Sequence, residues 1–262
     1  MRIVHFATRS LGIALALLAS LSLVSGVSAA PSSEKVIDGF VKSVEADKSI
    51  ADEQRSAVLK QVAESRKDAD ARATVITDAL VELYGDFDKA LVALGDEETA
   101  TAIEALKKLA ESKNAYLATE AKVYLARAYM MDEDFESAEP VLADLTGPQW
   151  ADKSLGIGEA HFMLGVAQAG LLKRKEAIKT LGKFVAEYPD APERLRVGAL
   201  IRIDELTFIR KGSLADVEGR MNFSRRKLDL EDSGDPTQTE QKNIVSMLDK
   251  LIKEAEKQEA GS

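Results

Sequence analysis

The chain is 262 residues long, carries a formal net charge of −9 and contains no Cys. This length is enough for one or two domains with a hydrophobic core. The lack of Cys excludes thiol catalysis, zinc–thiolate sites and stabilising disulfides. The acidic balance makes the chain a poor general ligand for nucleic acids or anionic lipids, so we expect no nucleic-acid partner.

The first residues have the layout of a secretory signal peptide. Arg2 and Arg9 give a positive start, and residues 11–24 form an apolar run that is short for a membrane span. No Cys follows the run, so the sequence does not indicate a bacterial lipoprotein anchor. The alternative interpretation is an uncleaved N-terminal anchor.

The cleavage site of this signal peptide is predicted near Ala29. Val27 and Ala29 fit the small-x-small rule of signal peptidase sites. A cut after Ala30 would place Pro31 directly behind the scissile bond, which the peptidase should disfavour. We therefore expect residues 1–29 to be removed, which leaves a periplasmic or secreted protein with no inserted membrane segment.

Helix is the only regular structure that the remaining sequence indicates. Ala, Leu, Glu and Lys dominate, and no stretch alternates cleanly between apolar and polar residues for more than a few positions. In chain order, the apolar spacing predicts helices over residues 32–47, 52–65, 68–94, 96–112, 115–131, 134–146, 153–171, 174–188, 192–210 and 214–229, and from about 235 onward.

The central helices share a repeated pairing of small residues. In three segments a Gly or Ala in one helix is followed twelve residues later by an Ala in the next helix. Antiparallel helices approach closely only where a small side chain lies at their crossing, so this spacing predicts stacked helix pairs. The pairs are Ala90 with Ala102, Ala126 with Ala138, and Gly165 with Ala177. An ordinary helix bundle with accidental spacing is the alternative.

Two of these units resemble the tetratricopeptide repeat family. The matching positions are Leu125, Ala126, Tyr129, Phe135 and Ala138 in one unit, and Leu164, Gly165, Ala177, Phe184 and Pro189 in the next. The stretch FVAEYPDAP also resembles repeats found in bacterial envelope-assembly proteins. The sequence departs from the family pattern at Lys122, His161 and Gln168, where the family has aromatic residues.

The resemblance implies an all-α fold, a right-handed α-solenoid of antiparallel helix pairs with helical flanks. It covers residues 83–190. Before it, residues 30–82 are expected to form an N-terminal helical region. After it, residues 191–232 are expected to form a further helix pair and residues 233–262 a C-terminal amphipathic helix.

We expect no catalytic site, no metal and no cofactor. His161 is the only His after residue 29, and it lies alone on an apolar helix face. The Glu–Ser pairs at 64–65, 111–112 and 136–137 lack the Gly-rich stretch that a transglycosylase needs after its catalytic Glu. An envelope hydrolase or transglycosylase that acts on peptidoglycan is the alternative function from another class.

The resemblance also implies that the first helices of the repeats line a concave surface that binds a protein or peptide. The ligand-facing positions it implies are Glu120, Val123, Arg127, Met130, Glu159, Phe162 and Val166. Arg127 and Glu120 would contact charged ends or the backbone of an extended peptide, while Met130 and Phe162 would supply apolar contact. The alternative is that these residues pack against the adjoining helix.

Charge is distributed unevenly along the chain. Residues 84–144 contain 14 acidic and 6 basic residues, whereas residues 193–228 contain 9 basic and 5 acidic ones. A basic patch is predicted at Arg194, Arg202, Arg210, Arg225 and Arg226. Such a patch would either bind an acidic partner or form ion pairs with the acidic middle of the same molecule.

The sequence therefore predicts an exported scaffold or adaptor of the bacterial cell envelope that binds another protein. The C-terminal helix has two interpretations, because its apolar stripe is nearly a heptad seam. It caps the open end of the stack, or it packs against another protein, which makes a structural homo-oligomer a further alternative.

Overall fold

The computed structural model describes residues 30–261, and the predicted signal peptide, residues 1–29, lies outside the described residues. Within the described range the regular structure consists of twelve α-helices and no strand, so the all-α prediction is confirmed. The helices are α1 (Ser33–Ala46), α2 (Asp52–Ser65), α3 (Ala69–Leu83), α4 (Gly85–Gly95), α5 (Thr99–Ala110), α6 (Ala115–Met131), α7 (Phe135–Leu145), α8 (Ile157–Gly170), α9 (Arg174–Glu187), α10 (Glu193–Phe208), α11 (Leu214–Asp229) and α12 (Asp235–Ala260).

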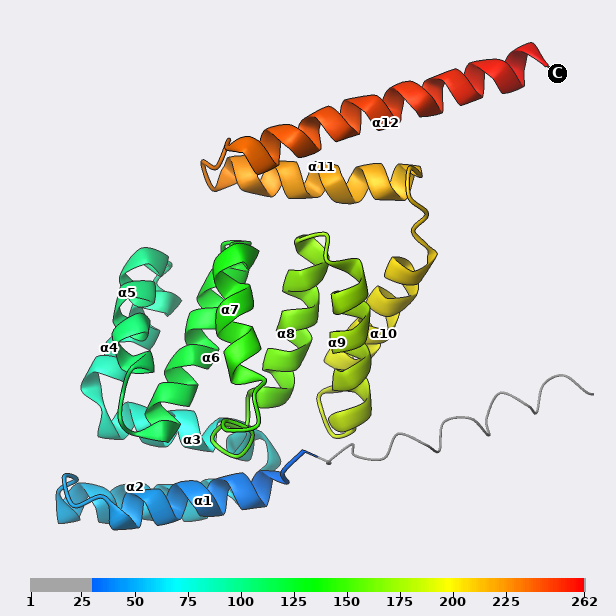
Figure 1. Cartoon of the computed structure of the whole chain (residues 1–262). Helices are drawn as coiled ribbons and strands as arrows, with labels where there is room; N and C mark the ends of the chain where they lie inside the picture. Colours follow the sequence, from blue (N-terminus) through cyan, green and yellow to red (C-terminus); the bar gives the residue numbers. More distant parts are fainter. Residues whose placement is uncertain (1–29, 262) are drawn as a thin grey trace, which may run out of the picture.

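The central helices form a solenoid-like stack (Figure 1). The antiparallel pairs α4–α5, α6–α7 and α8–α9 follow one another, and each helix from α4 to α9 packs against the next helix in the chain. The first helices of successive pairs also contact each other, from α4 to α6, to α8 and to α10. They therefore form the inner layer that the resemblance implied.

Helices outside the stack lie across both ends of its upright helices. The helices α1, α2 and α3 lie across one end of the upright helices, while the α11–α12 hairpin lies across the other end (Figure 1). On the N-terminal side, α3 packs against both α4 and α6. One end of the inner layer is therefore partly covered by the region that carries no repeat signature.

The small residues of the predicted crossings lie in the core. Ala90, Ala102, Ala126, Ala138, Gly165 and Ala177 are all buried. At Gly165 the two helices approach closely, since an added Cβ atom would lie 2.5 Å from both Cγ and Cδ2 of Leu181 on α9. A larger side chain at this point would force the two helices apart.

The turns within the pairs share one backbone conformation. Glu97, Glu133 and Leu172 adopt left-handed φ values of 62°, 53° and 61°, each seven residues after the small residue of its first helix. In each turn the amide of the following residue donates to the carbonyl five positions earlier, which is the Schellman arrangement. The turn between α11 and α12 has the same arrangement at Glu231, with φ of 59°. Glu and Leu do not favour this conformation, so the sequence did not reveal it.

The single helix predicted over 68–94 is wrong, because the chain breaks at Tyr84 into α3 and α4. Tyr84 is extended, with φ −131° and ψ 92°. Gly85 then begins α4, with Asp86 and Asp88 in its first turn, where carboxylates favour a helix start. The apolar spacing runs through the break and hides it.

The further helix pair expected over residues 191–232 does not form, although both of its helices exist. Helix α10 packs on α9 and α8 as the first helix of another repeat would, but α11 packs mainly against α12. Four large apolar side chains of α10 are consequently exposed, namely Val197, Leu200, Ile201 and Phe208. The physical reason is an ion-pair network on α11, described below, which holds this helix against the turns of the stack.

We predict that Gly165→Ala lowers the free energy of unfolding by about 1–3 kcal/mol, because the new methyl group overlaps Leu181. The matched control is Gly182→Ala in α9, where an added Cβ meets nothing within 4 Å. This control should raise stability by about 0.5–1 kcal/mol, since Ala favours helix over Gly. Urea unfolding followed by circular dichroism measures both changes, and equal midpoints for the two variants would contradict the crossing model.

Candidate functional site

A cavity of about 580 Å³ opens beside the inner layer of the stack. Side chains from α3, α6 and α8 line it, together with the loops at 151–156 and 187–192 and the start of α1. Glu120, Val123, Arg127 and Glu159 are the members of the implied ligand-binding set that line it.

Glu120 and Val123 form the floor of this cavity rather than its exposed wall. Glu120 is only 4 % exposed, and its Oε2 accepts a 2.9 Å hydrogen bond from the hydroxyl of Thr77 on α3. Burial raises the pKa of the Glu120 carboxyl, although hydrogen bonds from Ser154 and Thr77 oppose the shift. The loop at 151–156 lies over Val123. Neither Glu120 nor Val123 is therefore exposed enough to contact a ligand in the way that the sequence suggested.

Arg127 and Glu159 form a bidentate ion pair between α6 and α8. Arg127 donates from Nε to Oε1 at 3.1 Å and from Nη2 to Oε2 at 2.7 Å. Both side chains are 31 % exposed, and the guanidinium lies 4.6 Å from the ring centroid of Tyr124. Burial alone would lower the pKa of Arg127, but the hydrogen bond and charge of Glu159 outweigh it, so the pKa is raised. The pair holds one fixed charge of each sign at the cavity wall.

Met130, Phe162 and Val166, the other implied ligand-facing residues, do not line this cavity. Met130 and Val166 lie toward the C-terminal ends of α6 and α8, away from the loop that shapes the cavity. Phe162 packs on Phe184 of α9 with ring centroids 5.8 Å apart. The implied set is thus divided between the cavity and the contacts among helices.

Several cavity residues were missed by the sequence reasoning. Arg72 and Thr77 come from α3, in the N-terminal region without a repeat signature, and Tyr188 follows α9. His161 lies behind Tyr188 with ring centroids 5.1 Å apart. Burial, with the charge of Lys183, lowers the pKa of His161 to about 4, so the imidazole is neutral near pH 7.

The five arginines of the predicted basic patch lie in different places. Arg194 is exposed and lines the cavity of the inner layer. Arg202, Arg225 and Arg226 line a depression between α10, α11 and the turns of the stack. Arg210 is exposed and lies in neither cavity.

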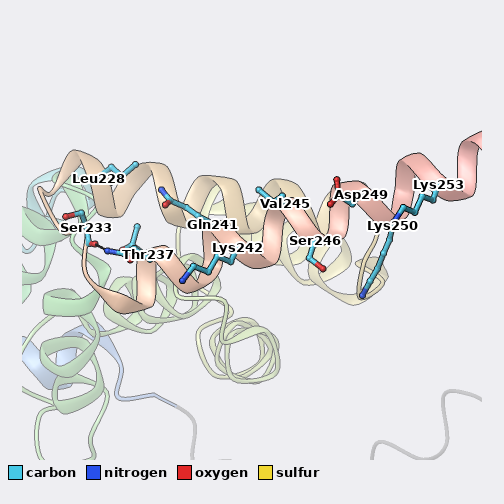
Figure 2. Close-up of a pocket in the computed structure, with 11 residues that line it drawn as sticks. Leu228, Ser233, Thr237, Gln241, Lys242, Val245, Ser246, Asp249, Lys250 and Lys253 are labelled. Atoms are coloured by element: carbon cyan, nitrogen blue, oxygen red, sulfur yellow. Dashed lines mark hydrogen bonds between the residues drawn. The ribbon is translucent and has the colours of Figure 1, made fainter.

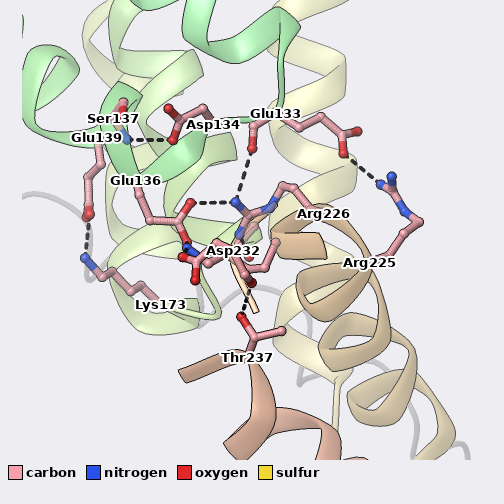
Figure 3. Close-up of polar contacts among 12 residues, drawn as sticks. Glu133, Asp134, Glu136, Ser137, Glu139, Lys173, Arg225, Arg226, Asp232 and Thr237 are labelled. Atoms are coloured by element: carbon pink, nitrogen blue, oxygen red, sulfur yellow. Dashed lines mark hydrogen bonds and ion pairs between the residues drawn. The ribbon is translucent and has the colours of Figure 1, made fainter. Parts of the chain in front are cut away.

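Arg226 anchors α11 to the turn between α6 and α7 (Figure 3). It is 3 % exposed, donates to Oε2 of Glu136 at 2.6 Å and to the carbonyl of Glu133 at 3.1 Å, and lies 4.7 Å from the ring centroid of Phe135. Arg225 pairs with the Glu133 carboxylate at 2.7 Å. We call this cluster, together with Lys227, the α11 latch. Arg225 and Arg226 therefore form ion pairs with the acidic middle of the same molecule, which is one of the two interpretations that the sequence left open.

The latch changes the ionisation of its central carboxylate. Burial alone would raise the pKa of Glu136, but the hydrogen bond and charge of Arg226 outweigh it and hold the pKa below the ordinary value of 4.5. Lys227 adds a further contact to Glu136 at 3.3 Å. The carboxylate of Glu136 therefore keeps its charge to a lower pH than an ordinary glutamate does.

The Glu–Ser pairs lie outside the inner cavity. Glu64 and Glu111 are exposed at the C-terminal ends of α2 and α5, and Glu136 is ion-paired in the latch. Within residues 30–261, no cluster of three or more His, Cys, Asp or Glu residues is arranged to hold a metal ion. No helix in the same range is long and apolar enough to cross a membrane.

Residues 159–191 match the family model of the Tetratricopeptide repeat. The match spans α8, α9 and the turn after them, and these are the helices in which Gly165 lies against Leu181. Residues 159–191 therefore form a tetratricopeptide repeat, and the pairs α4–α5 and α6–α7 share its left-handed turn. No significant match was found among curated proteins or among solved structures.

We predict that Glu136→Gln loosens α11, because it leaves the buried Arg226 without its charged partner. The docking free energy should fall by roughly 1–2 kcal/mol, a value reduced for the solvent screening of a carboxylate that is about one-third exposed. Hydrogen exchange of the α11 amides measures the loss. Glu139→Gln, on the same helix but paired with Lys173, is the matched control and should leave α11 protection unchanged.

The same latch should respond to acid. A depressed carboxyl pKa contributes stability above the unfolded value of 4.5 and loses it as the pH falls toward the folded value. The hydrogen-exchange protection of α11 should therefore decline below pH 4.5 in the native protein. The part of this decline that comes from protonation of Glu136 should be absent in Glu136→Gln. A decline of equal size in both proteins would show that other groups control it.

Proposed function

We propose that this protein is a protein–protein interaction scaffold that binds an extended segment of a partner in the cavity of its inner layer. A tetratricopeptide repeat is a binding fold with no chemistry of its own, which supports a role in interaction rather than catalysis. The observation that carries the proposal is the half-buried Arg127–Glu159 pair on the cavity wall. It presents fixed polar groups in a recess, as peptide-binding sites do.

The pair leaves binding capacity on Arg127. A guanidinium has five N–H donors, and the contact with Glu159 uses Nε and Nη2. Donors that remain on Arg127 can bind backbone carbonyls or a carboxylate of the incoming segment. Arg72 and Arg194 at the cavity edge extend the positive character, while Tyr124 and Tyr188 supply aromatic surface.

This arrangement favours a segment in extended conformation. An extended chain exposes its carbonyls, so a fixed donor such as Arg127 can bind the backbone whatever the side chains are. Glu159, held by the same pair, is positioned to attract a basic side chain or an N-terminal amine. Specificity then comes from the aromatic rings of Tyr124 and Tyr188, which line the cavity.

We predict that peptides selected by the purified protein from a random phage-displayed library bind in this cavity. Arg127→Met should weaken their affinity by about tenfold to a hundredfold, because a charge-assisted hydrogen bond is lost. Arg210→Met, which removes an exposed arginine outside the cavity, is the control and should bind like the native protein. Isothermal titration with the selected peptides measures both.

Two results would contradict the proposal. One is equal binding of the selected peptides to the native protein and to Arg127→Met. The other is a library from which no peptide is selected. Circular dichroism of Arg127→Met shows whether the variant keeps its helical fold, and Glu159→Gln provides a second change at the same pair.

We also propose that the protein is exported to the cell envelope. The composition of residues 1–29 supports this, as does a chain without Cys whose stability depends on its core. Expression in a bacterium with a periplasm should give a protein in the periplasmic fraction whose first residue is Ala30. N-terminal sequencing checks this, and a cytoplasmic protein that retains residues 1–29 would contradict it.

A further inference from the structure

Large apolar side chains at the surface are concentrated in the last three helices. Eleven large hydrophobic residues are exposed in the part of the chain that the structure describes, and nine of them lie between residues 197 and 252. Helices earlier in the chain bury their apolar faces against neighbours. The last three helices therefore have apolar surface that the monomer does not cover.

Five of these residues share one face of the α11–α12 hairpin, which we call the outer face. On α11 they are Leu214, Met221 and Leu228, with exposed fractions of 70, 52 and 47 %. On α12 they are Val245 and Ile252, with exposed fractions of 60 and 55 %. Residues within each helix are seven positions apart, so they form straight stripes along the two helices.

The outer face points away from the repeat stack. The opposite side of α11 carries Arg226 of the latch, and the side toward α12 carries the buried Val217 and Ser224. Helical periodicity places Leu214, Met221 and Leu228 on the remaining side. The latch that fixes α11 on the stack thus turns its apolar stripe toward solvent.

One residue of each stripe lines a common groove. Leu228 of α11 and Val245 of α12 line the same depression of about 830 Å³, together with Gln241 and several charged residues of α12 (Figure 2). Leu228 lies level with the start of α12, near Thr237 and Gln238. In an antiparallel hairpin, Met221 then lies level with Val245, and Leu214 with Ile252.

We propose that the outer face of the hairpin packs against the same face of a second copy of this chain. The result is an antiparallel four-helix bundle in which α11 of each copy lies against α12 of the other. Stripes that repeat every seven residues match a partner made of nearly parallel helices with the same repeat. The hairpin itself has this form, and a two-fold axis along the bundle uses both stripes of both copies.

The charges beside the stripes favour this pairing. The groove side of α12 carries Lys242, Lys250 and Lys253 against one acidic residue, Asp249. The exposed side of α11 carries Glu218, together with Arg225 and Asp229, which pair with each other at 2.6 Å. In the two-fold bundle the lysines of α12 face Glu218 on α11 of the other copy. The net charge of −9, which would repel two copies, is carried mainly elsewhere in the chain.

The flat area of the outer face is over half of the area that each partner buries in a standard dimer. Helix α11 has 16 residues, so the face is about 24 Å long at 1.5 Å per residue and about 20 Å wide across two helices. This gives on the order of 500 Å² of flat area, and the corrugation of the side chains adds to it. A standard interface buries about 800 Å² per partner.

Light scattering of the purified protein tests the proposal. The native protein should have about twice the mass of one chain, and Met221→Glu with Val245→Glu should have the mass of one chain at the same concentration. Leu200→Glu, which charges the exposed face of α10, is the matched control and should remain a dimer. A native protein of single-chain mass at every concentration, or loss of the dimer only in the control, would overturn the proposal.

Disulfide formation between different variants tests the geometry independently of stability. The chain has no Cys, so a Met221→Cys protein and a Val245→Cys protein each carry one thiol. When the two are mixed and oxidised, a disulfide between them should form readily, because α11 of one copy lies against α12 of the other. A mixture of Leu200→Cys with Val245→Cys should give no more mixed disulfide than random collision produces. Equal yields in the two mixtures would refute the arrangement.

Discussion

The structure depends on close crossings of helices at small residues. Gly165 admits Leu181 of the next helix, and the alanines at the other crossings are almost fully buried. Each crossing fixes the angle of one pair, and each pair presents its first helix to the next pair. The inner layer, and the cavity beside it, follow from this stacking. The shared left-handed turn keeps the two helices of a pair in register with the crossing.

A second constraint acts where the stack ends. Helix α10 occupies the place of a first helix, but α11 does not cover it, because Arg226 and its neighbours hold α11 against the turn that contains Glu133. A buried guanidinium is stable only with its hydrogen-bond and charge partners, so the contacts of Arg226 strongly favour this position of α11. Its consequence is apolar surface on α10 and on the hairpin that a regular final repeat would have buried.

The two surfaces serve different kinds of contact. The inner cavity is small, polar at its wall and partly covered by α3, which suits a single extended segment. The outer face of the hairpin is long, apolar and straight, which suits other helices. A dimer formed through the hairpin would carry two cavities on one particle. A partner with two binding segments would then gain affinity through the linkage, without any new contact in the cavity.

The sequence by itself determined the helical fold, the spacing of the crossings at Ala126, Ala138 and Gly165, and the position of the repeat, because local propensity and short-range periodicity encode them. Only the tertiary structure decided that Glu120 lies buried under a loop, that Arg127 binds Glu159 and that Arg226 binds Glu136. These contacts join residues that are distant in sequence. The residues of the two ion pairs lie 32 and 90 positions apart. Periodicity shows which face of a helix is polar but not which charge will meet it, so the final site depends on how the helices come together.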